Sequence, residues 1–245
     1  MEEEHFIFSV KEQSIKQILV SLGADVCGIG SIDRFKDAPA GFSPKDIYHE
    51  CRSVISFGVA LPKGVMEVSP KLIYSHFNGP VITQRVDEIA LLASKRIEEQ
   101  WNAVAVPIPS DAPNEYWDAE NLTARGMISM KHTAVSCGIG QLGKSTLLLN
   151  PTYGSLLVIG AILTNLELQS DELCENICID KCRRCIDHCP AHAINEGNVS
   201  QKLCRPNTYG KTARGFDTVE CNACRNVCPM KYGKVKKTLE SNVTS

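Results

Sequence analysis

The chain has 245 residues, 43% of them hydrophobic and 22% charged, with a formal net charge of −2 at pH 7. This length suits one large or two modest domains, and the near-neutral charge gives no reason to expect bulk electrostatic binding of nucleic acid. The acidic N-terminus lacks the basic and apolar regions of a signal peptide, and no run approaches the ~18 apolar residues of a membrane span. The sequence therefore predicts a cytoplasmic protein with no membrane or nucleic-acid partner.

Residues 1–170 alternate between patterns typical of helices and of strands. Ser9 followed by Glu12 forms a capping box, and apolar residues at helical spacing follow it up to Gly23. The further predicted elements are a strand at 25–32, a helical turn opening at Ser43-Pro44, a strand at 53–61, a helix at 83–101, a strand at 103–108, a polar irregular loop at 110–127 and a strand at 156–164. Such alternation predicts an α/β core in which helices cover a sheet.

The last third of the chain carries two similar cysteine runs, each ending in Cys-Pro. They are Cys178-x3-Cys182-x2-Cys185-x3-Cys189-Pro190 and Cys221-x2-Cys224-x3-Cys228-Pro229, with Cys204 between them. In two-cluster ferredoxins, three closely spaced thiolates bind one iron–sulfur cluster, and the cysteine before proline binds the other. Crossed ligation then predicts two [4Fe–4S] clusters, the first on Cys178, Cys182, Cys185 and Cys228 and the second on Cys189, Cys204, Cys221 and Cys224.

Two other uses of paired cysteines compete with this interpretation. Structural zinc also takes four thiolates from C-x2-C pairs, but two Cys-Pro steps fit ferredoxin spacing better. Disulfides are less favoured because cysteines two or three residues apart are poorly placed to bridge each other. Three residues separate Cys178 from Cys182 where the usual run has two, and Cys174 lies just upstream, so the sequence leaves the first ligand open. Clusters near solvent are oxygen-labile, which predicts an oxygen-poor cell.

A glycine-rich loop spans residues 138–145, with the sequence Gly-Ile-Gly-Gln-Leu-Gly-Lys-Ser. It fits both the G-x-G-x-x-G pattern and the G-x-x-x-x-G-K-[ST] phosphate loop. A phosphate loop needs a sustained helix after it, yet Asn150-Pro151 would end such a helix early. The sequence therefore weighs against nucleotide binding. Three glycines so close together still predict a close approach of the backbone to another group.

The segment from Cys137 to Pro151, together with Tyr153-Gly154-Ser155 and the two Cys-Pro runs, resembles the core of epoxyqueuosine reductases. That family and the reductive dehalogenases imply a flavin-reductase-like α/β core of the nitroreductase or cobalamin-processing type. The resemblance places this core at 1–170, a small two-[4Fe–4S] ferredoxin-like domain at 171–232 and a basic, polar tail at 233–245. The positions expected to bind a corrinoid are Cys137, Gly138, Gly140, Gln141, Gly143, Lys144 and Tyr153.

The resemblance implies an iron–sulfur oxidoreductase that relays low-potential electrons through two [4Fe–4S] clusters to bound cobalamin, which is reduced or reduces a small substrate. A ferredoxin or flavodoxin would be the donor. An alternative is an electron-transfer protein without a corrinoid, which docks a partner or holds flavin. A third hypothesis is a nucleotide-dependent redox activator that uses the glycine loop.

Proton donors for such a reduction are sought among side chains near the loop. His132 and Lys131 are the candidates, although a capping histidine and a solvated lysine explain them as well. Cys137, for its part, also suits a small buried apolar residue. The epoxyqueuosine reductases carry a proton-donating aspartate before the glycine loop, and this chain has Ala124 at that place. In those enzymes, helical repeats that hold tRNA follow the second Cys-Pro step, and the present sequence ends near that step. These departures predict a substrate other than tRNA epoxyqueuosine.

Overall fold

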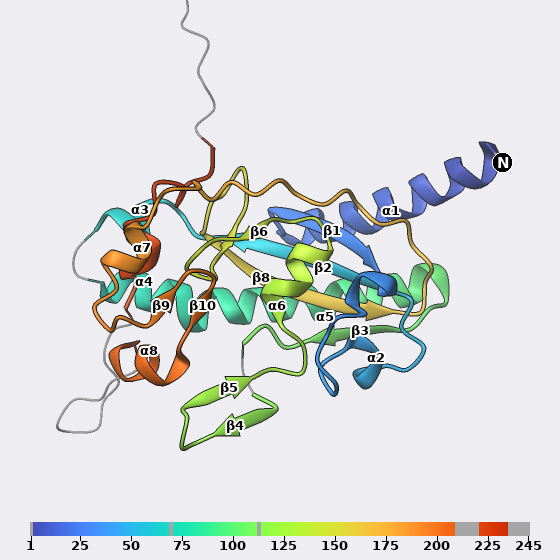
Figure 1. The fold of residues 1–245 in the computed structure, drawn as a ribbon. Helices are drawn as coiled ribbons and strands as arrows, with labels where there is room; N and C mark the ends of the chain where they lie inside the picture. Colours follow the sequence, from blue (N-terminus) through green and yellow to red (C-terminus); the bar gives the residue numbers. More distant parts are fainter. Residues whose placement is uncertain (1, 69–70, 112–113, 209–220, 235–245) are drawn as a thin grey trace, which may run out of the picture.

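The computed structural model describes residues 2–68, 71–111, 114–208 and 221–234, so most of the predicted tail lies outside the described residues. At its centre is a four-stranded sheet with the order β1-β2-β8-β3, in which every neighbouring pair is antiparallel (Figure 1). The strands are β1 (Val26–Ser31), β2 (Ser53–Ala60), β3 (Ala105–Ile108) and β8 (Leu157–Thr164). All four predicted strands are thus present, with ends shifted by no more than two residues.

The two central strands are buried on both faces of the sheet. β2 pairs with β8 along its whole length, from Ser53 opposite Thr164 to Ala60 opposite Leu157. Their sequences are nearly continuous apolar runs, because side chains that alternate between two covered faces must all be apolar or hydrogen-bonded. This explains why these strands carry no polar alternation.

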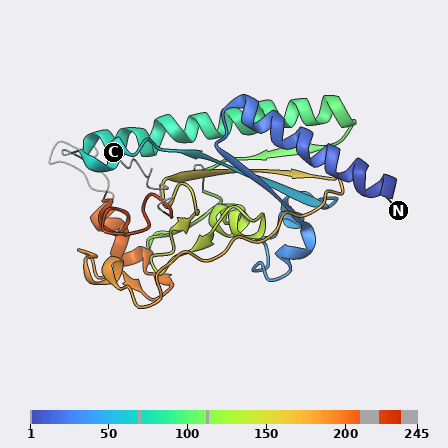
Figure 2. The same cartoon turned by 90° about the horizontal axis from the view of Figure 1, so that it is seen from above.

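Helices α1 (Glu2–Leu22) and α5 (Ile82–Trp101) cover one face of the sheet (Figure 2). The main core cluster lies between them and the sheet, and its fully buried members include Ile15, Leu19, Ile55, Val86 and Ile97. The predicted helical periodicity is confirmed, but the predicted start at Ser9 is wrong. Helix α1 already begins at Glu2.

The opposite face of the sheet is covered by shorter elements. These are a 3₁₀ turn (Ile32–Phe35), α2 (Pro44–Ile47) and α6 (Met130–Ser136). The predicted turn at Ser43-Pro44 is α2, and its capping box is complete: the Ser43 side chain accepts a backbone N–H, and Asp46 accepts the Ser43 N–H at 2.8 Å.

Two stretches between these layers have more structure than the sequence predicts. The polar segment 110–127, predicted to be irregular, holds a hairpin of β4 (Tyr116–Asp118) and β5 (Thr123–Arg125). The helices α3 (Gly64–Glu67) and α4 (Leu72–His76) and a π-helical turn (Phe77–Val81) precede α5. No helix among the described ranges is long and apolar enough to cross a membrane.

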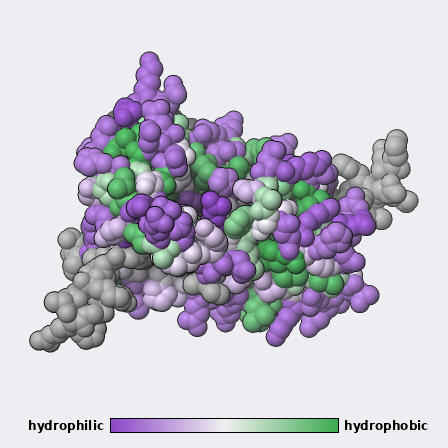
Figure 3. All heavy atoms as spheres, turned by 60° about the horizontal axis from the view of Figure 1, so that its bottom comes forward, coloured by the Kyte–Doolittle hydropathy of each residue, from purple (hydrophilic) through white to green (hydrophobic). Residues whose placement is uncertain are grey.

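The cysteine-rich segment lies at one end of the sheet, beside α3 and α4 (Figures 1 and 2). It consists of α7 (Arg184–Asp187), the short pair β9 (Ile194–Asn195) and β10 (Asn198–Val199), α8 (Gln201–Thr208) and α9 (Ala223–Asn226), joined by loops. Hydrophilic side chains predominate on the face drawn in Figure 3, with apolar patches scattered between them. The fold is therefore a mixed α/β arrangement with a loop-rich cysteine region at its end.

Candidate functional site

The glycine-rich loop forms a β-hairpin. Its strands are β6 (Gln141–Leu142) and β7 (Leu148–Leu149), and Gly143 at the turn donates its N–H to the Leu147 carbonyl at 2.9 Å. A phosphate loop needs a helix whose free N–H groups point at the phosphates, and here a strand stands in that place. The structure thus gives the apparent phosphate-loop pattern a different role.

The glycines of this loop serve close approach between segments of the chain itself. Gly138 has φ +75°, and a Cβ built on it would lie 2.2 Å from the Glu172 carbonyl oxygen. A Cβ on Gly140 would lie 2.6 Å from the Leu149 carbonyl oxygen. The predicted close approach of backbone is confirmed, and its partner is protein backbone.

Polar side chains of the loop continue this contact along the next segment of chain. The Gln141 amide donates to the Cys174 carbonyl at 3.0 Å. The Lys144 ammonium donates to the carbonyls of Ile179 at 3.3 Å and Cys182 at 3.1 Å, and also to that of Asp180. Residues 138–145 thus run along residues 172–182 and hold them, and we call residues 138–145 the cradle.

A hollow of about 360 Å³, which includes space open to solvent, lies where the cradle meets the cysteine loops. Four cysteines contribute to its wall, namely Cys178, Cys182, Cys185 and Cys228. Gly143 and Lys144 of the cradle form another part of the wall, and Arg184 and Met230 also line it. The hollow is therefore lined by the four predicted ligands of the first cluster.

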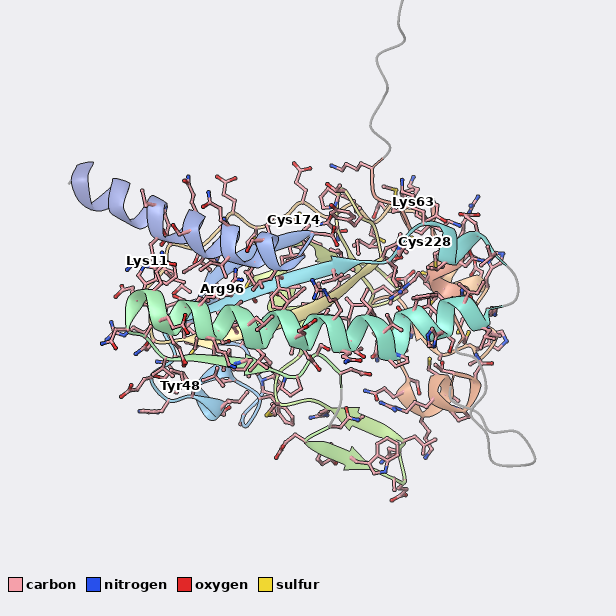
Figure 4. The ribbon with its side chains drawn as sticks, turned by 180° about the vertical axis from the view of Figure 1, so that it is seen from behind. Lys11, Tyr48, Lys63, Arg96, Cys174 and Cys228 are labelled. Carbon is pink, nitrogen blue, oxygen red and sulfur yellow. The ribbon has the colours of Figure 1, made fainter. Side chains whose placement is uncertain are left out.

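The structure distinguishes the two candidates for the first ligand. Cys178 lines the hollow, whereas Cys174 is absent from its wall. In the view of Figure 4, Cys228 lies toward one end of the molecule and Cys174 nearer its middle. The geometry favours Cys178.

The thiols of the first set lie close enough to influence one another. Burial raises the pKa of Cys228, and the nearby Cys178, Cys185 and Cys182 raise it further. The pKa of Cys185 is likewise raised by burial first and then by Cys178 and Cys182. Cys228 of the second run thus lies near three cysteines of the first run, at the same hollow.

The second set gathers around α8 and α9. Burial raises the pKa of Cys224 to about 11; Arg225 lowers it, and Cys221 and Cys204 raise it. Cys189 is buried and packs in one apolar cluster with Cys204 and Cys224 among its neighbours. The Cys189 sulfur accepts the Ala193 N–H at 3.4 Å, the kind of bond that stabilises a thiolate.

The donor chemistry of both sets suits iron–sulfur clusters. Each set offers four cysteine sulfurs, the ligands that [4Fe–4S] clusters take, with one thiolate on each iron. In the part of the chain that the structure describes, no group of three or more His, Cys, Asp or Glu side chains is arranged to hold one metal ion. The fit to clusters rests on the four thiols around the hollow and on the crossed origin of Cys228.

The two predicted proton donors lie at the start of α6. The His132 Nδ1 is 2.7 Å from the hydroxyl of Ser129, the N-cap residue of α6, so the exposed imidazole makes a local side-chain contact and caps no backbone group. The Lys131 ammonium lies 3.5 Å from the Thr146 hydroxyl at the hairpin turn. The Lys131 side chain is exposed, but partial loss of hydration lowers the pKa of its ammonium. The nearby Cys224 raises this pKa, and Arg225 lowers it. Lys131 therefore lies on the side of the second thiol set.

Two other residues expected at a corrinoid are packed into the protein. Cys137 is fully buried, its thiol donates to the Val54 carbonyl at 3.4 Å, and burial raises its pKa. Tyr153 packs against the apolar cluster of α6 and β8. Gln141 and Lys144 are bonded to the cysteine segment, so these four side chains contact protein in this structure, while Gly143 and Lys144 also line the hollow.

Ala124 is the residue that the resemblance sets against the aspartate of the epoxyqueuosine reductases. It is buried in β5, and the Gln201 side chain of α8 accepts its N–H at 3.0 Å and donates to its carbonyl at 3.2 Å. Arg205 also lies over the Trp117 ring of β4, 5.2 Å from the ring centre. Helix α8, which carries Cys204, thus holds the β4–β5 hairpin. No local pattern in the sequence signals this contact, since its partners are far apart in the chain.

The fold is that of a mixed α/β protein with two sets of cysteines near one end of its sheet. No family model matches the chain. It is 26% identical to the epoxyqueuosine reductase of Lactococcus garvieae over 210 residues, a match that covers 81% of this chain and 57% of that protein. This chain therefore corresponds to little more than half of that relative's length.

Solved structures show the same fold. A crystal structure of epoxyqueuosine reductase with a tRNA-Tyr epoxyqueuosine-modified stem loop matches with a TM-score of 0.67 and 19% identity, over 93% of this chain and 67% of that one. A reductive dehalogenase structure, described as suggesting a mechanism for B12-dependent dehalogenation, matches with a TM-score of 0.61 and 17% identity, over 92% and 32% of the two chains. The chain is thus similar in sequence to epoxyqueuosine reductases, and it shares its fold with them and with reductive dehalogenases.

Proposed function

We propose that the chain is an iron–sulfur oxidoreductase that carries low-potential electrons through two [4Fe–4S] clusters to a corrinoid. The observation that carries the two-cluster part is the position of Cys228, which comes from the second cysteine run and lies among Cys178, Cys182 and Cys185 of the first. Crossed ligation of this kind is the arrangement of two-cluster ferredoxins. Bound clusters of this type supply one-electron transfer at potentials down to roughly −700 mV.

The chain's own residues prepare the two sites. Buried thiols such as Cys224 and Cys228 hold their protons when no cluster is bound, because burial disfavours the thiolate. Loading a cluster therefore releases protons from these cysteines. The cradle binds residues 172–182 and so holds Cys178 and Cys182, two of the four thiols of the first set, near the hollow before a cluster is loaded.

The corrinoid part of the proposal is supported by the relatives. The related reductive dehalogenase structure concerns B12-dependent chemistry, and electron delivery to cobalt is a task suited to low-potential clusters. The residues that the resemblance assigns to corrinoid contact are engaged elsewhere: Gln141 and Lys144 bind the cysteine segment, and Cys137 is buried.

A second candidate function is favoured by two observations: the side chains of Gln141 and Lys144 bind the cysteine segment, and Ala124 stands where the resemblance implies an aspartate. An electron-transfer protein without a corrinoid, which docks a partner or holds flavin, needs neither the aspartate nor an open glycine loop. In both candidates a ferredoxin or flavodoxin is the proposed electron donor. The structural match to a reductase bound to a tRNA stem loop weighs against the expectation that nucleic acid is no partner, so tRNA epoxyqueuosine belongs among the substrates to be tested.

The test uses protein purified without oxygen and loaded with iron and sulfide. It is incubated with hydroxocobalamin and a low-potential reductant, passed through a desalting column, and assayed for cobalt, flavin and its visible spectrum. Near-stoichiometric cobalt, with conversion to the Co(I) spectrum faster than without protein, supports the corrinoid acceptor. Intact clusters with no retained cobalt refute it and favour the electron-transfer protein.

A further inference from the structure

Lys144 occupies the place of a phosphate-binding lysine in the sequence, but its ammonium is bound within the protein. It donates to the carbonyls of Ile179 at 3.3 Å and Cys182 at 3.1 Å, and to that of Asp180 between them. Its own carbonyl accepts the Gly197 N–H at 3.0 Å, from the turn between β9 and β10. Lys144 thus links the hairpin of the α/β core to two parts of the cysteine region.

The three carbonyls belong to the loop between the first two cysteines of the first run. The contacts of Lys144 with Ile179 and Asp180 are exposed and the contact with Cys182 is part-buried, and the Ile179 carbonyl also accepts the Cys182 N–H at 3.1 Å. A lysine ammonium has three N–H donors and can serve three acceptors at once. The match between three donors and three carbonyls orients the loop, with Cys178 and Cys182 toward the hollow.

From this geometry we propose that Lys144 is the positioning residue of the first cluster: it holds the Cys178–Cys182 loop in ligating geometry and places a positive charge beside the cluster. The inference rests on the proposed two-cluster function. Lys144 is itself part of the wall of the hollow. Net charge and hydrogen bonding near a cluster set its reduction potential, and a positive charge favours the reduced form. Lys144 therefore makes the potential of the first cluster less negative.

The test compares Lys144→Met with Lys181→Met in the full chain, loaded with iron without oxygen. Lys181 lies in the same loop, is exposed, and has no hydrogen bond or ion pair within the described ranges, so its replacement removes the same charge without the three contacts. The measurements are iron and sulfide per chain and the potential of each cluster by EPR titration. Lys144→Met is expected to lose about half of the iron, the share of one [4Fe–4S] cluster, whereas Lys181→Met keeps it.

A second variant keeps the proposal testable if Lys144→Met fails to fold. Lys144→Gln retains two N–H donors but no charge, so the first cluster should still assemble and its potential alone should become more negative. Full iron content and unchanged potentials in both Lys144 variants would overturn the proposal. Absence of clusters from the wild-type protein would instead refute the two-cluster function, so the two failures are distinguishable.

Discussion

Replacement of Gly138 by alanine tests whether the cradle holds the cysteine segment by close backbone approach. Gly138 has φ +75°, and an added Cβ would lie 2.2 Å from the Glu172 carbonyl oxygen. A left-handed backbone costs an alanine roughly 1–2 kcal/mol, and forcing an extra carbon into packed structure costs about 1–3 kcal/mol more. Gly138→Ala should therefore destabilise the protein by about 2–5 kcal/mol.

Gly41→Ala is the matched control, because Gly41 has φ +83° and nothing within 4 Å of the added Cβ. It should cost only the conformational term of roughly 1–2 kcal/mol. For a chain of this size each kcal/mol lowers the melting temperature by about 2–4 °C, so Gly41→Ala should lower it by about 2–8 °C and Gly138→Ala by about 4–20 °C.

The assay is thermal unfolding of the iron-loaded variants at one scan rate without oxygen, followed by circular dichroism. Iron content is measured on the same samples, since displacement of residues 172–182 should also weaken the first cluster. Equal melting temperatures for Gly138→Ala and Gly41→Ala, with full iron in both, would refute the idea that the glycine is required by the approach of Glu172.

Three further predictions concern single side chains. Cys178→Ser should reduce iron from about eight to about four per chain while Cys174→Ser leaves it unchanged, as measured by iron assay; the reverse result would make Cys174 the ligand. Burial raises the pKa of Cys27 to about 11, so its thiol is neutral near pH 8. The rate of its alkylation, followed by mass spectrometry, should therefore rise about tenfold per pH unit up to pH ~10. A rate that levels off near pH ~8.5 would contradict the raised pKa. Gln201→Ala removes both hydrogen bonds to the β5 backbone and should lower the free energy of unfolding by about 1–3 kcal/mol. Hydrogen exchange in the β4–β5 hairpin should be faster in this variant than in the control variant Leu203→Ala. Equal exchange rates in the two variants would show that α8 does not hold the hairpin.

The sequence predicts well those parts of the fold that depend on local pattern. The buried strands β2 and β8 and the helix α5 follow from continuous apolar runs and helical periodicity, which need no knowledge of distant partners. The start of α1 was missed because Ser9 and Glu12 imitate a capping box inside a longer helix. The β4–β5 hairpin was missed because its polar residues also suit an irregular loop.

In the candidate site, too, the sequence predicts the features that depend on local spacing and misses the contacts between distant residues. Spacing alone predicts which cysteines group together, because the fourth cysteine before each proline is part of the pattern. The role of Lys144 could not be predicted, since its carbonyl partners lie 35 to 38 residues away and backbone carbonyls leave no trace in the sequence. The same holds for Gln201, whose contact with Ala124 spans 77 residues. Three glycines in the cradle did signal a close approach, but they did not identify the approaching group.

The most direct test of the two-cluster claim is iron, zinc and acid-labile sulfide quantitation on protein purified without oxygen, with an EPR spectrum after reduction. Two [4Fe–4S] clusters predict about eight irons and about eight sulfides per chain and a low-potential signal from reduced clusters. Stoichiometric zinc with neither sulfide nor a reduced-cluster signal would contradict the account and make the cysteines structural.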